Sequence, residues 1–208
     1  MPDLSALGAF CAAAFLLNIA PGPDMLYVIG RSIGQGRRAG TVSALGIFAG
    51  CLVHIFIAAV GLAAVLRSSS ILFNTVRYAG AAYLTYLGLR VLFEPARAPR
   101  LPETQSASLS RIFVQGVITN VLNPKVALFF LAFLPQFIQP QRGSIAFQII
   151  VLGLIFDTGG TIVDLAVAQA GGRLADVLRE HSGFARLQKW LTGTIFIGLG
   201  LRVAWKRS

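Results

Sequence analysis

Long apolar runs dominate the chain, and most are long enough to cross a lipid bilayer. A spanning helix needs about 20 mostly apolar residues, and six windows of this kind fill most of the sequence. They are Leu4 to Gly30, Ala39 to Leu66, Ile71 to Phe93, Ile112 to Ile138, Ser144 to Gly171 and Leu187 to Trp205. The pattern therefore predicts an all-α membrane protein with six transmembrane helices.

Composition agrees with this prediction. Hydrophobic residues make up 55% of the chain, charged residues only 12%, and the mean hydropathy is +0.72, whereas soluble domains average about 25% charged residues. The windows leave no segment for a soluble catalytic domain. We therefore expect a multi-pass protein of the bacterial inner membrane that contacts lipid and is not an enzyme.

The formal net charge of +10 would suggest nucleic acid as a partner for a soluble protein, but here it indicates orientation and predicts no nucleic-acid binding. The loops after the first, third and fifth windows hold more Lys and Arg than the opposite side; Arg37 and Arg38 are examples. Loops rich in Lys and Arg usually lie on the cytoplasmic side of the membrane, so both termini are predicted to lie outside.

The first window is interrupted near its centre. The interruption consists of Asn18, Ile19, Ala20, Pro21, Gly22, Pro23 and Asp24. Pro21 and Pro23 lack an N–H, so the carbonyls of Leu17 and Ile19 lose their helical donors, and Gly22 lets a ligand approach the backbone. Non-helical backbone at membrane depth survives only inside protein or beside a polar cavity, so we expect a solute site here. The alternative is a proline kink whose aspartate caps the helix at the interface.

The fourth window has a similar interruption, which consists of Asn120, Val121, Leu122, Asn123, Pro124 and Lys125. Pro124 is expected to free the carbonyl of Asn120. A lysine near the membrane centre costs about 3 kcal/mol on insertion scales and is by default functional. Lys125 is therefore expected either to contact the ligand directly or to form a structural ion pair with Asp24 or Asp157.

The fifth window carries Asp157 at its midpoint and Asp164 seven residues later, on the same helical face, with Gly159 and Gly160 between them. The glycines are expected to admit a close neighbouring helix. With Asp24, the membrane holds three acids against one lysine, so protonation or a substrate ammonium must neutralise the excess. This pattern is what a proton-coupled amino acid carrier needs. Asp164 itself is interpreted as an acid near the end of its window without a coupling role.

Other polar features of the windows are weaker. His54 is expected to be a hydrogen-bonded packing residue, and Gly46 and Gly50 are expected to serve helix packing within one subunit. Cys11 and Cys51 occur singly, without a CxxC or a histidine cluster, so no metal site, redox dithiol or cofactor is predicted.

The chain also shows a weak internal duplication. The pentapeptide LGLRV occurs at 87–91 and again at 199–203, and the interrupted helices begin at Asn18 and Asn120. We predict two three-helix repeats, 1–93 and 112–208, joined by a polar linker at 94–111. Three spans per repeat make this a 3+3 inverted repeat with discontinuous helices 1 and 4. Many secondary transporters bind substrate between such helices near the midplane.

Several segments resemble a known family. They are Asn18 to Pro23 followed by Gly40, Gly46, Gly50 and Gly61, then Ala79 to Gly88, and Asn120 to Phe137 with Leu122-Asn123-Pro124-Lys125. Over nearly its full length the chain is similar to the lysine exporter and homoserine/threonine resistance (LysE/RhtB) family. The resemblance implies a six-span inner-membrane exporter of amino acids or their derivatives, driven by the proton gradient. Asp164 departs from it, because an aromatic residue, often tyrosine, is expected there.

The expected substrate site combines the resemblance with the physical argument. The resemblance supplies Asn18, Pro21, Gly22, Pro23, Asn123, Pro124, Lys125 and Asp157, and the physical argument adds Asp24 and Asn120. The expected activity is export of homoserine, threonine or a similar amino acid with protons as the coupling ion, by a chain that forms a homodimer or acts alone. Two alternatives are a membrane thiol-disulfide electron carrier, which needs paired cysteines, and an uncoupled small-solute channel.

Overall fold

The computed structural model describes residues 4–62, 64, 70–93, 106–180, 189–190, 193–194, 197–198 and 200–201. These residues form helices and connecting turns, with no strand among them. The long elements are α1 (Leu4–Ile19), α2 (Pro23–Gln35), α3 (Arg37–Ile57), α5 (Ser70–Phe93), α6 (Leu109–Val121) and α8 (Ile145–Glu180). Short elements are the π-helical η1 (Ala58–Leu62) and η2 (Phe129–Phe133), the α-helical α7 (Pro124–Leu128), and the 3-10 turns η3 (Leu134–Phe137) and η4 (Pro140–Arg142).

Between two and four segments of the described chain are long and apolar enough to cross a membrane. Arg37–Gly61 and Ile145–Ala170 qualify as single helices. Two further spans are bent pairs: Leu4–Ile19 with Pro23–Gln35 meets at 47°, and Leu109–Val121 with Pro124–Phe137 meets at 44°. The predicted interruptions of the first and fourth windows are therefore present as sharp bends.

The third predicted window coincides with α5, which is not among these candidate spans. The sixth window, 187–205, falls only partly within the described residues, and most of the predicted linker, 94–105, lies outside them. The count of six spans therefore stays a prediction.

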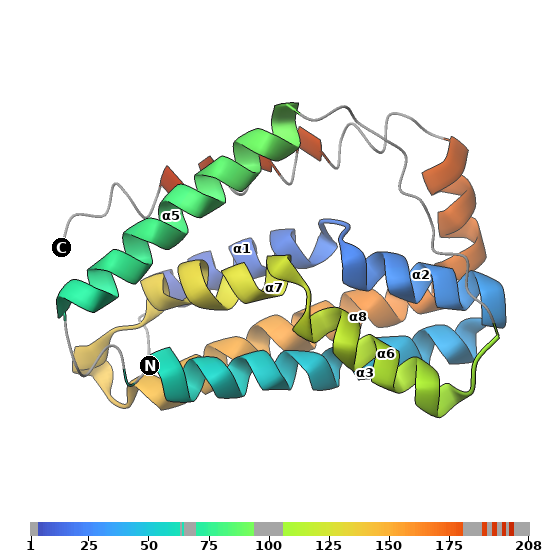
Figure 1. Ribbon diagram of the computed structural model, residues 1–208, viewed down its shortest axis with the longest axis horizontal. Coiled ribbons are helices and arrows are strands. Elements are labelled where there is room, and N and C mark those ends of the chain that lie inside the picture. Colours follow the sequence, from blue (N-terminus) through green and yellow to red (C-terminus); the bar gives the residue numbers. More distant parts are fainter. Residues whose placement is uncertain are drawn as a thin grey trace.

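Helix α3 lies against both α6 and α8, along the lower edge of the view in Figure 1. The contact with α6 depends on glycine. A Cβ atom on Gly46 would clash with the backbone carbonyl of Phe113, and one on Gly50 would come within 2.7 Å of the Val117 carbonyl. Since backbone cannot yield as a flexible side chain can, these positions must remain small. The prediction that Gly46 and Gly50 serve helix packing is confirmed.

Helix α5 packs against η2 and, farther along, against the described pieces of the last segment. The latter contact is reciprocal. A Cβ atom on Gly88 would come within 2.7 Å of the Gly193 carbonyl and of the Ile197 side chain. A Cβ atom on Gly200 would come within 2.8 Å of the Ala81 carbonyl and would clash with the side chain of Thr85. Both glycines belong to the repeated pentapeptide LGLRV.

An aromatic cluster fills the core between α1, η2, η3 and α8. It consists of Phe10, Phe129, Phe133, Phe137 and Phe156, all of which are buried. The rings of Phe129 and Phe156 stack with centroids 3.8 Å apart, and Phe10 contacts Phe137 edge-on at 5.2 Å. The evenly spaced phenylalanines of the fourth window, Phe129, Phe133 and Phe137, are thus core residues.

Candidate functional site

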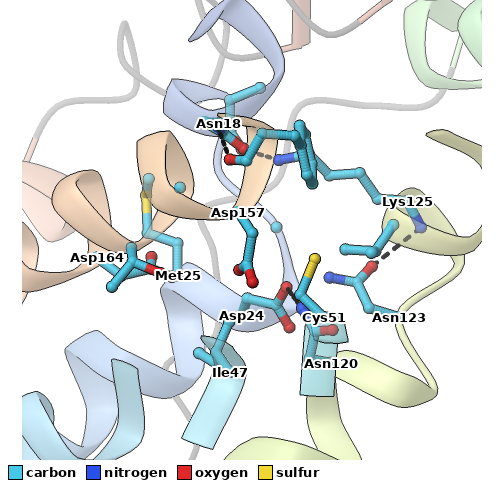
Figure 2. A pocket seen from close by; sticks show the side chains of 16 residues that line it. Asn18, Asp24, Met25, Ile47, Cys51, Asn120, Asn123, Lys125, Asp157 and Asp164 are labelled. Atoms are coloured by element: carbon cyan, nitrogen blue, oxygen red, sulfur yellow. Dashed lines mark hydrogen bonds between the residues drawn. The ribbon is translucent and has the colours of Figure 1, made fainter. Parts of the chain in front are cut away.

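The two interrupted spans meet around one cavity with a volume of about 40 Å³. Three elements supply its polar walls (Figure 2). The first interruption contributes Asn18, Gly22 and Asp24, and the second contributes Asn120, Asn123 and Lys125. Helix α8 contributes Asp157, Thr161 and Asp164. Space of this size holds about three water molecules, each of which needs polar partners.

The first interruption leaves a backbone carbonyl that a side chain of the other half reaches. The Lys125 ammonium donates a 2.6 Å hydrogen bond to the Ala20 carbonyl oxygen. The lysine side chain passes close to Gly22, where a Cβ atom would make an ordinary van der Waals contact, 3.4 Å from Lys125 Cδ. Helix α2 then restarts at Pro23, whose missing N–H costs nothing in the first turn.

The second interruption is closed more completely than the sequence predicts. Pro124 was expected to leave the Asn120 carbonyl unbonded, but that oxygen accepts the Asn123 N–H at 2.9 Å and lies 3.1 Å from His54 Nε2. The expectation of a free carbonyl at Asn120 is therefore wrong, because the turn itself supplies a donor. The Asn123 side chain caps α7 by accepting the Lys125 N–H at 3.0 Å.

His54 is a hydrogen-bonded packing residue, as predicted. Besides its contact with Asn120, its ring stacks on Phe130 with centroids 5.9 Å apart and planes only 8° from parallel.

Asparagines connect each interruption to the opposite half. Asn120 Nδ2 donates to Asp24 Oδ2 at 2.9 Å, and Asn18 Nδ2 donates to the Phe156 carbonyl on α8 at 2.9 Å. Glycines make room for both: a Cβ atom on Gly160 would lie 3.1 Å from Asn18 Oδ1, and one on Gly50 would lie 2.8 Å from Asn120 Cβ. The two halves are thus joined reciprocally at the cavity.

Lys125 is not locked in an ion pair. Within the described chain, no acid lies within the 4.0 Å that defines a salt bridge to its ammonium, and its recorded hydrogen bond goes to a backbone carbonyl. The structural ion pair with Asp24 or Asp157 considered above is therefore not formed in this conformation. The charge stays available at the cavity wall.

Several buried oxygen atoms at the cavity have no hydrogen-bond partner. They are Asp24 Oδ1, Asn120 Oδ1, Asp157 Oδ2 and Thr161 Oγ1. Burial of such a group without a partner costs roughly 1 to 3 kcal/mol, and more for a charged group. Four such oxygen atoms around one small cavity leave acceptor positions that a hydrogen-bond donor inside the cavity would satisfy.

The position of Asp164 corrects the sequence interpretation. It was set aside as an acid near the end of its window, but it lines the cavity and is only 7% exposed. Thr161, which the sequence analysis missed, lines the cavity between the two acids. The spacing of positions 157, 161 and 164 is a helical stripe that could have identified both residues.

The predicted site residues divide into two groups. Seven line the cavity: Asn18, Gly22, Asp24, Asn120, Asn123, Lys125 and Asp157. The three prolines do not. Pro23 and Pro124 begin α2 and α7, and Pro21 lies in the bend between α1 and α2. The prolines therefore shape the site, and other residues line it.

The two cysteines lie in different environments. Cys51 is buried on α3 and lines the cavity, whereas Cys11 is exposed on α1, and neither forms a disulfide. The thiol-disulfide alternative thus gains no support from their placement.

The chain is similar over nearly its full length to several known proteins. The leucine efflux protein of Salmonella typhimurium is 28% identical over 200 residues, covering 96% of this chain and 94% of that protein. The leucine efflux protein of an Enterobacter strain is 29% identical over 94% of this chain and 93% of its own length. An uncharacterized membrane protein of Pseudomonas aeruginosa is 31% identical over 89% of this chain and 88% of its own length.

No solved structure matches the chain. The family model described as LysE type translocator matches residues 15–207, which include both interruptions and every residue that lines the cavity. The chain, with its cavity between two interrupted helices, belongs to the LysE type translocator family.

Proposed function

We propose that the protein is a proton-coupled secondary transporter that exports an amino acid or amino acid derivative across the bacterial inner membrane. The observation that carries the proposal is the cavity itself. It lies where two interrupted helices meet, and it is lined by one ammonium group, three carboxyl groups and three carboxamides. Family membership and the leucine efflux relatives support amino acid export as the general activity.

The cavity suits a zwitterion. A substrate carboxylate is expected to bind the Lys125 ammonium, which must exchange its bond to the Ala20 carbonyl for one to the ligand. A substrate ammonium is expected to donate to Asp24 Oδ1 and Asp157 Oδ2, which are the buried carboxyl oxygens without partners. The cavity is narrow, so bulkier substrates require the walls to move apart.

The reciprocal contacts support a 3+3 inverted repeat. Gly88 meets Gly193 and Ile197, and Gly200 meets Ala81 and Thr85. These residues form three pairs that are each related by a shift of 112 positions: Gly88 with Gly200, Ala81 with Gly193, and Thr85 with Ile197. Each half therefore makes the contact that the other half makes. A pseudo-two-fold arrangement of this kind is what an inverted repeat produces.

The two ends of the bundle are closed by different means, which supports alternating access. The aromatic cluster described above seals one end. At the other end, a polar network joins α2 to α6 and to Ala107, which precedes α6. Tyr27 Oη donates to the Ile112 carbonyl at 2.7 Å, Arg31 Nη2 donates to Gln115 Oε1 at 2.6 Å, and Gln35 Nε2 donates to the Ala107 carbonyl at 2.9 Å. We call these contacts the α2–α6 latch.

The latch consists of a few hydrogen bonds, one between two side chains and two from side chains to backbone carbonyls. Separation of α2 from α6 exposes polar groups that water can satisfy, whereas separation of the aromatic cluster exposes buried apolar surface. The latch is therefore the end that opens more readily.

The excess of acids over bases in the cavity supports the proposal of proton coupling. Asp24, Asp157 and Asp164 share the cavity with Lys125, and unpaired charges inside a membrane are expensive. If one of these aspartates binds a proton in one conformation and releases that proton in the other, substrate transport is coupled to proton transport. Both termini outside and a homodimeric assembly also remain predictions.

Counterflow in proteoliposomes tests the proposal. Vesicles that contain purified protein are loaded with unlabelled amino acid, and uptake of the labelled form is followed for leucine, homoserine, threonine and lysine. A carrier gives transient accumulation above equilibrium, which an uncoupled channel cannot give. In intact cells, an uncoupler should stop efflux. Absence of counterflow with every amino acid would refute the proposal, and unchanged efflux with uncoupler would refute proton coupling alone.

A further inference from the structure

We propose that the cavity binds a monovalent metal cation, with sodium as the preferred ion, between Asp24, Asn120, Asp157 and Thr161. The ion site depends only on the oxygen atoms of the cavity wall. Competition between this ion and the substrate rests, in addition, on the proposed function.

The buried side-chain atoms of the cavity wall that lack hydrogen-bond partners are all oxygens. Two belong to carboxyl groups, Asp24 Oδ1 and Asp157 Oδ2; Asn120 Oδ1 belongs to a carboxamide and Thr161 Oγ1 to a hydroxyl. Asn120 and Asp157 are only 2% and 4% exposed, so bulk solvent does not satisfy them. Oxygens of these kinds are the ligands that hard metal cations prefer.

The four oxygens come from three helices that meet at the cavity, α2, α6 and α8. Asn120 Nδ2 donates to Asp24 Oδ2 at 2.9 Å, which keeps the Oδ1 atoms of both side chains near each other. Figure 2 shows the Asp157 carboxyl group pointing toward Asp24. Thr161 follows Asp157 by four residues on α8, so their side chains are neighbours on one helical face. One ion between the three helices can therefore contact several of these oxygens.

The charge of the cavity favours a cation. Three aspartates line it together with one lysine, and unpaired carboxylates are expensive at membrane depth. The Lys125 ammonium donates to the Ala20 carbonyl and forms no ion pair with an acid of the described chain. A proton on one carboxyl group would supply a single donor. A metal ion offsets the same charge and contacts several oxygens at once.

The size and ligands of the cavity favour a monovalent ion. Ca²⁺ takes about six to eight oxygen ligands, and Mg²⁺ usually keeps several of its waters, whereas the volume here is about 40 Å³. The Lys125 ammonium lines the same cavity and repels a divalent ion twice as strongly as a monovalent one. Among the described residues, no three His, Cys, Asp or Glu side chains are placed to hold a metal ion, which disfavours a transition metal. A site of neutral and acidic oxygens has no cysteine or histidine motif, so the sequence did not predict it.

The ion and the substrate should exclude each other. The substrate ammonium is expected to bind Asp24 Oδ1 and Asp157 Oδ2, which are also two of the ligands of the ion. Each brings one positive charge to the same oxygens. The cavity therefore exchanges sodium for substrate.

Thermal unfolding of the purified protein in detergent tests the ion site directly. Sodium chloride replaces choline chloride at constant ionic strength, so that screening is unchanged. A ligand that binds the folded state raises the unfolding midpoint as its concentration rises. We expect sodium to raise the midpoint by about 2 °C or more relative to choline, with a smaller rise in potassium chloride. Equal midpoints in sodium and choline, or a rise with Ca²⁺ or Mg²⁺ alone, would overturn the proposal.

Variants of the ligands assign the site. Thr161→Val keeps the shape of the side chain and removes its oxygen, so several-fold more sodium should be needed for the same shift. Asp157→Asn removes the charge and should abolish the shift. Thr119→Val is the matched control and should respond to sodium as the unaltered protein does, because Thr119 Oγ1 donates to the Gln115 carbonyl and does not line the cavity. If Thr161→Val and Asp157→Asn change the midpoint but not its dependence on sodium, their role is structural and the assignment is wrong.

Counterflow in sodium-free choline medium separates this inference from the proposed function. If an amino acid gives counterflow but sodium does not raise the unfolding midpoint, the ion site is wrong and the export proposal stands. If sodium raises the midpoint but no amino acid gives counterflow, the proposed function fails and the ion site stands. Where both results are positive, sodium should raise the KM for the amino acid several-fold without changing the maximal rate, and an unchanged KM would contradict the competition.

Discussion

The Lys125 ammonium, carried by the second interruption, donates to the Ala20 carbonyl oxygen exposed by the first, across 2.6 Å. The bond joins a charged side chain of the second half of the chain to a backbone carbonyl in the first half. It also occupies the ammonium with a neutral acceptor that a carboxylate can replace, because a charged acceptor forms the stronger hydrogen bond.

Replacement of Lys125 tests this relationship. Lys125→Ala should abolish export while the protein still inserts in the membrane, because the variant lacks the cation that binds the substrate carboxylate. Efflux of labelled amino acid and the amount of protein in the membrane fraction are measured together. Lys125→Arg, which keeps the charge but alters its geometry, is the control and should retain part of the activity. Normal efflux by Lys125→Ala would show that the lysine is not essential.

Asp157 should be equally important. Asp157→Asn retains the size of the side chain but removes its charge and replaces one carboxylate oxygen with an NH₂ donor. In the unaltered protein, Asp157 Oδ2 is buried and has no hydrogen-bond partner. Export should fall by about ten-fold or more, which corresponds to loss of a charged hydrogen bond of about 1.5 to 3 kcal/mol. Initial rates of counterflow measure the effect. Asn18→Ala serves as a comparison, because it removes an uncharged cavity side chain whose amide donates to the Phe156 carbonyl. Unchanged counterflow rates in Asp157→Asn would contradict the proposed role of Asp157.

The glycine contact between α3 and α6 predicts a stability effect. Gly46→Ala should destabilise the folded protein by about 1 to 3 kcal/mol, because the added Cβ clashes with the Phe113 carbonyl. The loss of stability is measured by thermal unfolding in detergent, in which the fraction of protein that stays monodisperse is recorded at each temperature. Gly8→Ala on α1 is the matched control, since nothing lies within 4 Å of a Cβ at that position. Equal behaviour of the two variants would show that the contact is looser than the structure indicates.

The α2–α6 latch predicts a change in access to the cavity. Gln115→Leu removes the acceptor of Arg31 Nη2 on α6 while the bond from Arg31 Nη1 to Gln35 Oε1 within α2 remains, and should favour the conformation that opens there. Cys51 lines the cavity and is 2% exposed, so its reaction with a membrane-impermeant thiol reagent reports opening. Cys11→Ser removes the exposed thiol from the background. We expect Cys51 to react several-fold faster in Gln115→Leu, and an unchanged rate would mean that the latch does not hold the cavity closed.

Local pattern was sufficient to predict the two interruptions and most of the cavity wall. Pro21, Pro23 and Pro124 cannot continue a helix that precedes them, because they lack an N–H and their rings clash with the turn before, and both bends appear where these residues predict them. Charged and amide side chains within apolar windows had to face protein or a cavity, which identified Asp24, Lys125 and Asp157.

The sequence prediction failed where the outcome depended on distant partners. The Asn120 carbonyl, expected to be free, is satisfied by the Asn123 N–H and by His54. Asp164 seemed to lie near a span end, but the rotation of α8 against α2 and α3 brings it into the cavity. Neither result follows from periodicity, since a helical pattern gives the face of a helix but not which neighbour that face meets.

The sequence by itself determined that this protein lies in a membrane, that two of its helices are broken, and which polar groups lie within its apolar windows. These properties are local, since they depend on hydropathy and on the backbone chemistry of proline. The tertiary structure decided that both breaks share one cavity, that Lys125 binds the Ala20 carbonyl, and that Asp164 joins Asp157 on the cavity wall. These depend on close helix approach at glycines, where packing fixes the rotation of each helix.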